Sequence, residues 1–140
     1  MRWPNRKVHT LTKGMRRAQA ALAGFLPLID WTTFRRVNLN REVKALSSNI
    51  ACFACGDKSQ ALVWLLRKDT LGRDGMVRRD VPPARTMLRI PGLAPGRYRV
   101  TGWDTVEGRV TSTFDANAEG ALMLETPPFV ADLALSLIHI

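Results

Sequence analysis

The order of apolar and polar positions divides the chain into a helical part and a strand-rich part. Between residues 11 and 29, apolar residues recur at spacings of three and four, which is the pattern of one helix face. They are Leu11, Met15, Ala18, Leu22, Phe25 (or Leu26) and Ile29. Thr12 suits the N-cap position of this helix, and Pro27 ends or kinks it. Asp30 is expected to cap one further short turn, Trp31–Arg36.

From Asn49 onward the pattern is that of strands. Ile50–Cys55 and Gln60–Arg67 are apolar on both faces, which is typical of strands inside a sheet. Shorter apolar or alternating segments follow, separated by turn residues, at 85–90, 97–103, 109–114, 121–125 and 130–135. A spacing of about 8–12 residues between strands is typical of an antiparallel sandwich. The expected fold is therefore mostly β, a small antiparallel β-sandwich of about seven strands preceded by an N-terminal helical segment.

The two cysteines stand in a C-x-x-C arrangement, which can be a redox motif or half of a zinc site. Cys52 and Cys55 fall in an expected strand, where residues three apart lie about 10 Å from each other and on opposite faces. A disulfide needs Cα atoms within about 7 Å. Since no second pair of ligands accompanies them, two free thiols are expected.

The net charge of +9 is concentrated in the helical part. Residues 1–48 hold ten Lys or Arg and two acids, a net +8, whereas residues 49–140 hold eleven and ten, a net +1. A phosphate-binding patch is one interpretation. The basic residues are spread out and have no aromatic stacking pattern, which favours instead a helical face whose acidic neighbours lie outside this chain. The apolar stretches 20–29 and 61–66 are shorter than a membrane helix needs, and no membrane partner is expected.

Three segments carry a resemblance to a known accessory domain. Ala61–Arg67 reads A-L-V-W-L-L-R, Pro91–Thr105 reads P-G-L-A-P-G-R-Y-R-V-T-G-W-D-T, and Pro128–Leu135 reads P-F-V-A-D-L-A-L. In this order they resemble the C-terminal β-sandwich of cellulase- and mannanase-type (β/α)8 glycoside hydrolases. The segments that resemble the end of such a barrel lie upstream, at 1–4, 18–22 and 25–31.

The resemblance implies a division of the chain. Residues 1–36 would be the end of the catalytic barrel, with a loop and the last helix, residues 37–48 a connector, and residues 49–135 the β-sandwich. The implied partner is the missing N-terminal catalytic barrel of the same polypeptide, and polysaccharide is a second candidate. Residues 136–140 are predicted to be a non-native tail in which His139 has no role.

The residues that would carry catalysis are not apparent. Glycoside hydrolysis uses two carboxylates about 5–9.5 Å apart in a sugar-binding cleft. The four glutamates occupy the expected connector, turns and a strand end: Glu42, Glu107, Glu119 and Glu125. The resemblance places the catalytic glutamates of the family upstream of Met1. The chain is therefore predicted to be inactive by itself, with no catalytic residue.

The four tryptophans are the candidates for sugar contact, because an aromatic ring can stack on a sugar. Trp3, in the loop that resembles the one after the last barrel strand, and Trp103, at a strand end, are predicted to contact carbohydrate. Trp64 is expected in the core, and Trp31 is expected to pack the connector on the sandwich.

No metal or cofactor is expected, because Asp69, Asp74 and Asp80 lack the spacing of a calcium loop. Three hypotheses remain: a structural accessory domain, a carbohydrate-binding sandwich, and a small basic nucleic-acid-binding protein.

Overall fold

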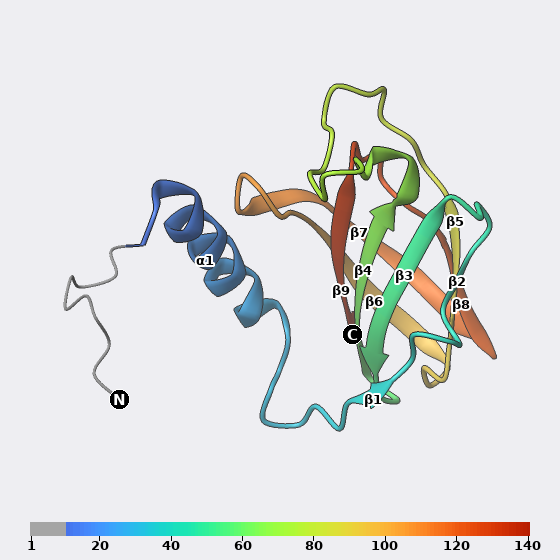
Figure 1. The fold of residues 1–140 in the computed structure, drawn as a ribbon. Helices are drawn as coiled ribbons and strands as arrows, with labels where there is room; N and C mark the ends of the chain where they lie inside the picture. The colour runs from blue at the N-terminus through green and yellow to red at the C-terminus, as the bar shows by residue number, and fades with distance from the viewer. Residues whose placement is uncertain (1–10) are drawn as a thin grey trace, which may run out of the picture.

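A computed structural model describes residues 11–140, so the predicted contact of Trp3 lies outside the described residues. The elements are α1 (Lys13–Phe25), η1 (Leu26–Leu28), β1 (Val37–Asn38), β2 (Lys44–Ala45), β3 (Ile50–Gly56), β4 (Gln60–Arg67), η2 (Lys68–Thr70), β5 (Met87–Pro91), β6 (Gly96–Asp104), β7 (Arg109–Glu119), β8 (Ala121–Glu125) and β9 (Asp132–His139). The expected mostly β fold with an N-terminal helix is confirmed (Figure 1).

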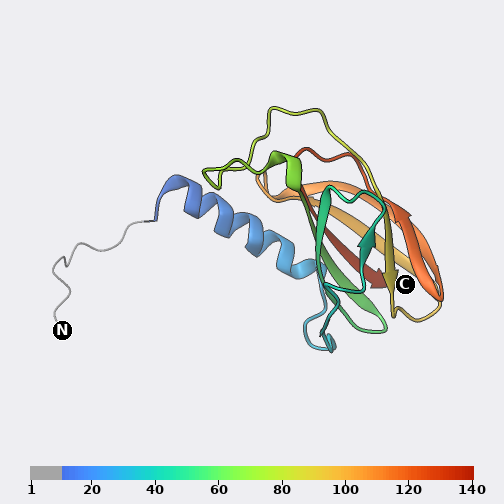
Figure 2. The ribbon, with the colours of Figure 1, turned by 45° about the vertical axis from the view of Figure 1, so that its right-hand side comes forward.

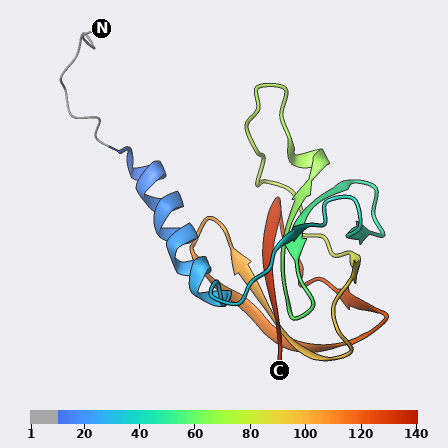
Figure 3. The same cartoon turned by 90° about the horizontal axis from the view of Figure 1, so that it is seen from below.

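Within residues 11–140, nine strands form one antiparallel sheet in the order β1-β3-β4-β9-β6-β7-β8-β5-β2. The count exceeds the predicted seven because the segment 37–48, expected to be a connector only, contributes the two-residue strands β1 and β2. The sheet curls, so the side formed by β3, β4 and β9 faces β5 and β8 across the core (Figures 1 and 3). No helix in the described part of the chain is both long enough and apolar enough to cross a membrane.

The core fills the inside of the curl with alternate residues of the long strands. On β4 the inward residues are Ala61, Val63 and Leu65, and on β9 they are Leu133, Leu135 and Leu137, all buried. Because β4 is apolar on both faces, its Leu62, Trp64 and Leu66 form a second apolar row that points outward. This outer face is the one that α1 approaches (Figure 2).

The helix begins and ends where its capping residues predict. The Thr12 hydroxyl accepts from the Met15 amide, and Pro27 follows the last helical residue within η1. Of the thirteen helical residues, only Ala21 and Phe25 are buried. Most of the predicted apolar face therefore remains open to solvent in this chain.

Tyr98 supports the interior at the end of the sheet near the connector. Its side chain is fully buried, and its hydroxyl lies 2.9 Å from the Lys58 carbonyl and 2.7 Å from the Ala94 carbonyl. His139 packs edge-on against the Tyr98 ring with a centroid distance of 5.0 Å. Residues 136–139 are thus part of β9, so the expectation that the last strand ends near Leu135 is wrong, whereas the non-native origin of residues 136–140 stays a prediction. The reason is register: Ser136 and Leu137 pair with both β4 and β6.

A Tyr98→Phe substitution tests this support. It removes the hydroxyl but keeps the ring, leaving two carbonyls at the core margin with one fewer partner. We expect a loss of about 1–2 kcal/mol in the free energy of unfolding. Urea denaturation at equal m-value would measure it, and an unchanged midpoint would show that the hydroxyl contributes nothing.

Asp57 and Asp30 hold the connector against the end of β4. Asp57 accepts from the amides of Arg35, Ser59 and Gln60, and Asp30 accepts from the hydroxyls of Thr32 and Thr33. Burial raises the pKa of Asp57, but these amides more than offset it and hold the pKa below its ordinary 3.8. The Thr32 and Thr33 hydroxyls likewise lower the pKa of Asp30. Asp30 also accepts from the Thr32 amide and so caps a turn as expected, but that turn covers residues 31–33 and not the predicted 31–36.

These shifts give a direction for the dependence of stability on pH. A carboxyl whose folded pKa is depressed stabilises the fold above its unfolded pKa, and this stabilisation is lost as pH falls through the folded pKa. The melting temperature should therefore fall as pH drops below about 3.8, with a shallower slope in Asp57→Asn. A thermal melt series from pH 6 to pH 2 tests this, and equal slopes for the two proteins would contradict it.

Candidate functional site

The three segments that carry the family resemblance meet on the outer face of the sheet, around Asp132. The Trp64 indole N–H donates to Asp132 Oδ2 over 3.0 Å, and the Thr105 hydroxyl donates to the same oxygen over 2.7 Å. The Arg79 guanidinium bonds the other oxygen over 3.2 Å. One carboxylate thus connects β4, β9, the β6–β7 turn and the long loop 71–86. Since the Asp132 side chain is only 10% exposed, these contacts satisfy a nearly buried charge.

A second buried charge closes the adjoining end of the sheet. Arg67, the last residue of β4, donates to the carbonyls of Pro82 and Val130 over 2.7 and 2.8 Å. Its guanidinium also makes a forked ion pair with Asp69. The bonds to the two carbonyls hold together the chain segments around Pro82 and Val130, which cross this end of the sheet. This role was not predicted from the sequence, although a charged residue that ends an apolar strand is a signal for it.

Helix α1 lies over the Asp132 cluster, which is formed by Asp132, Trp64, Thr105 and Arg79. Its main contact there is Trp103. The rings of Phe25 and Trp103 meet at a steep angle with centroids 6.0 Å apart. A Cβ placed on Gly24 would lie 3.0 Å from the Trp103 ring, so the absence of a side chain there lets the helix approach closely. Arg17 bonds Glu107 Oε1 over 2.6 Å and the Val106 carbonyl over 3.1 Å.

The position of Trp103 does not suit the predicted sugar contact. By strand alternation the ring points outward, but it is only 7% exposed because α1 covers it. A sugar stacks on an open aromatic face, which Trp103 lacks in this arrangement. The Trp103 ring instead packs against the helix, where it contacts Phe25.

Trp64 and Trp31 also differ from expectation. Trp64 was expected in the core, yet its ring is 39% exposed on the outer face, beside Phe53 at a centroid distance of 5.2 Å. The outward side of β4 is apolar without being enclosed, which periodicity alone could not show. Trp31 packs on Phe34 and donates to the Leu26 carbonyl, so it braces the turn after the helix and not the sandwich itself.

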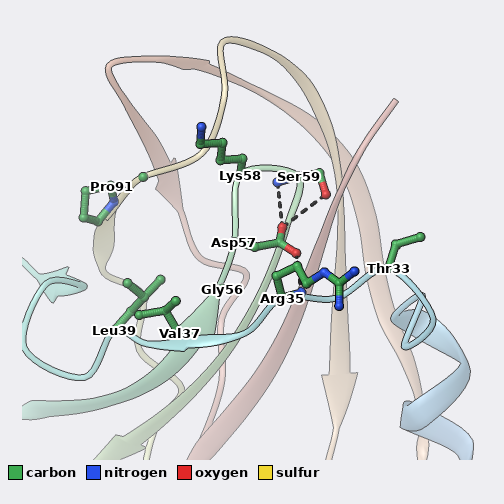
Figure 4. A pocket seen from close by; sticks show the side chains of 10 residues that line it. Thr33, Arg35, Val37, Leu39, Gly56, Asp57, Lys58, Ser59 and Pro91 are labelled. Carbon is green, nitrogen blue, oxygen red and sulfur yellow. Dashed lines mark hydrogen bonds between the residues drawn. The ribbon is translucent and has the colours of Figure 1, made fainter.

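A cavity of about 580 Å³ lies where the connector crosses the end of β3 and β4 (Figure 4). Val37, Leu39 and Pro91 give it an apolar wall. Figure 4 shows the Lys58 and Arg35 side chains pointing in different directions, while the Asp57 carboxylate is occupied by its own loop. The polar groups do not converge on one point, so the cavity lacks the arrangement of a catalytic centre.

The four glutamates are also spread over several elements of the described chain. Each of the four glutamates is exposed, and they are distributed over the connector, the β6–β7 turn and the ends of β7 and β8. Cys52 and Cys55 are free, as predicted, and burial raises the pKa of both thiols. Among residues 11–140, no group of three or more His, Cys, Asp or Glu side chains could hold a metal ion.

Comparison with protein-family models gives no match, and comparison with curated proteins gives none either. The arguments for function therefore come from the motif residues and their geometry.

Replacing Asp132 tests whether its bonds to Trp64, Thr105 and Arg79 stabilise the surface on which α1 packs. Asp132→Ala leaves the Trp64 indole, the Thr105 hydroxyl and Arg79 without their acceptor, and we expect a loss of about 2–4 kcal/mol in the free energy of unfolding. Asp115→Ala is the matched control, because that carboxylate is an exposed partner of Arg97 and Arg99 and should cost less than about 1 kcal/mol. Equal losses in the two variants would contradict the assigned role.

Proposed function

We propose that this chain is the non-catalytic C-terminal part of a glycoside hydrolase, in which the β-sandwich supports the catalytic barrel and α1 joins the two. The observation that carries the proposal is the use of the motif residues. Trp103 packs against Phe25 of the helix, and Trp64 and Thr105 donate to Asp132 beneath it. Such an arrangement suits a structural module.

The exposed side of α1 supports a docking role. Leu22 is 60% exposed and Met15 is 52% exposed, and Leu26 and Leu11 continue the same apolar stripe. Next to the stripe, a groove between helix and sheet is lined by Ala18, Leu22, Trp64 and Ala134 among others. An apolar surface made by two elements favours a packing partner over water.

The outer face of the sheet extends this surface. Phe53 and Trp64 form a half-exposed pair on β3 and β4, and Leu62 lies beside them in a shallow apolar hollow. The helix covers the Trp103 side of the face and leaves the Phe53 side open. A barrel flank resting on α1 would cover the remainder, which is the arrangement that the resemblance implies.

The charge distribution also suits a partner of the same polypeptide. The basic residues of the described helical segment are exposed, and only Arg17 among those on α1 forms an ion pair in the described chain. An acidic barrel flank would complement Lys13 and Arg16. Nucleic acid is the alternative partner for such charge, but it would need aromatic or fork-like recognition that the helix does not provide.

The carbohydrate-binding alternative has one specific observation in its favour. The Phe53–Trp64 pair is the most open aromatic surface near the motif cluster, and its rings are tilted by only 32°. Affinity electrophoresis with soluble β-glucan and mannan would separate the hypotheses. Retardation that disappears in Trp64→Ala would favour sugar binding, and no retardation would favour the structural role.

The proposal predicts that the chain releases no reducing sugar from β-glucan or mannan and that Leu22 belongs to a docking surface. Leu22→Glu should change the free energy of unfolding of the chain by less than about 0.5 kcal/mol, because the side chain is already exposed. It should lower the melting temperature of the longer polypeptide encoded upstream, once that reading frame is cloned. Gln19→Glu, which adds the same charge to another exposed helix position, is the control.

Hydrolysis by the purified chain would refute the non-catalytic role. Equal melting temperatures for the longer polypeptide with Leu22→Glu and with Gln19→Glu would refute docking through α1. An upstream reading frame without barrel strands and two glutamates would remove the proposed parent.

A further inference from the structure

Helix α1 contacts the sheet through only a small part of its surface. Among its thirteen residues only Ala21 and Phe25 are buried, and within residues 11–140 its hydrogen bonds to the sheet and its turns come from Arg17 alone. Figure 2 shows the helix projecting away from the sheet. An element with so few buried contacts belongs to the least stable part of a fold, where local opening costs less free energy than global unfolding.

The segment that follows the helix is held more firmly. Ile29 and Phe34 are buried, and the Gln60 side chain accepts from the Asp30 amide over 2.8 Å and donates to the Asp30 carbonyl over 3.1 Å. Between this anchored segment and α1 lies η1, where Pro27 has no N–H with which to continue the α-helical hydrogen bonds. The change from loosely held to firmly held chain therefore falls within η1.

Two glycines allow the close fit between α1 and the sheet. A Cβ on Gly24 would lie 3.0 Å from the Trp103 ring, and a Cβ on Gly108, in the β6–β7 turn, would lie 3.1 Å from the Ala21 Cα atom. Phe25 packs on the same Trp103 ring from the next position along the helix. The two elements come this close because neither glycine has a side chain, so one added methyl group should disturb the fit.

We propose that α1 is a hinged arm, which swings about η1 while the connector stays on the sheet, and that the fit at the two glycines is its closing contact. In the open state Trp103 loses its cover. The Arg17–Glu107 ion pair adds little to closure, because both side chains are about half exposed. In the longer polypeptide of the proposed function, the same hinge would make the joint between barrel and sandwich movable. That consequence rests on the proposed function, whereas the arm itself does not.

Hydrogen exchange of the 140-residue chain, followed by NMR, tests the opening. A thirteen-residue helix is marginal in water by itself, so an open arm also exposes its amides to exchange. The amides of residues 17–25 should exchange at least about 100-fold faster than the protected amides of β4 and β9, which global unfolding alone exposes. Equal rates in the two groups would overturn the hinge, and rates in α1 equal to those of an unstructured peptide would overturn the closed state.

A core variant separates arm opening from global unfolding. Val63→Ala weakens the core, which stays intact when the arm opens. It should therefore speed exchange in β9 at least about tenfold and leave α1 within about twofold. An equal increase in both elements would show that α1 leaves the sheet only when the whole fold does.

A pair of glycine variants tests the closing contact. Gly24→Val should speed exchange in α1 at least about tenfold, because the added side chain meets the Trp103 ring. Gly14→Val is the matched control: a Cβ there meets only the Thr12 hydroxyl at 4.0 Å, so the same chemical change should alter the rates less than about threefold. Equal effects of the two substitutions would overturn the assigned contact.

A reversible disulfide tests the arm by a second route. A Cβ on Gly108 would lie 3.2 Å from the Ala21 Cβ, just under the about 3.5 Å at which disulfides begin. In a chain with Cys52→Ser and Cys55→Ser, Ala21→Cys and Gly108→Cys together should form this bond on mild oxidation. Exchange in α1 should then be at least about tenfold slower than after reduction. No bond, or equal exchange before and after reduction, would overturn the proposal.

These measurements use the chain alone, so failure of the hinge and failure of the accessory role are distinct results. An arm that stays closed would reject the hinge and leave the docking of Leu22 untouched. Equal melting temperatures for the longer polypeptide with Leu22→Glu and with Gln19→Glu would reject the docking and leave the hinge standing.

Discussion

The structure depends on one constraint: its central strands are apolar on both faces, and a curled sheet can enclose only one of them. The inward rows of β4 and β9 are buried completely, which closes the core. The outward row, with Trp64, Trp103 and Ala134, needs another cover. Helix α1 covers part of it, so its attachment to the sheet is a consequence of sheet composition and not of helix propensity.

Two nearly buried charges make that attachment specific. Asp132 joins Trp64, Thr105 and Arg79 beneath the helix, and Arg67 ties the crossing segments at the same end. A buried charge with incomplete partners is costly, so few arrangements of these segments satisfy both groups at once. The motif residues thus specify the geometry of a support, which agrees with the proposed accessory role.

Two surfaces of the described chain are left open. The α1 stripe and the Phe53–Trp64 pair are apolar, and a covering partner would bury them by the hydrophobic effect.

Much of the fold could be predicted from the sequence because local signals determine it. The alternation in β6, the glycine turns, the Thr12 cap and the free cysteines needed only spacing and residue type. The roles of the tryptophans could not be predicted, since an outward-facing ring can bind a ligand or pack against another element of the chain. Which of the two it does depends on what lies above the ring. Trp103 lies under a helix about eighty residues away in the chain, whereas Trp64 borders the groove beside that helix and stays 39% exposed. The continuation of β9 through His139 and the gathering of contacts at Asp132 were likewise decided by tertiary pairing, which joins segments that no local pattern relates.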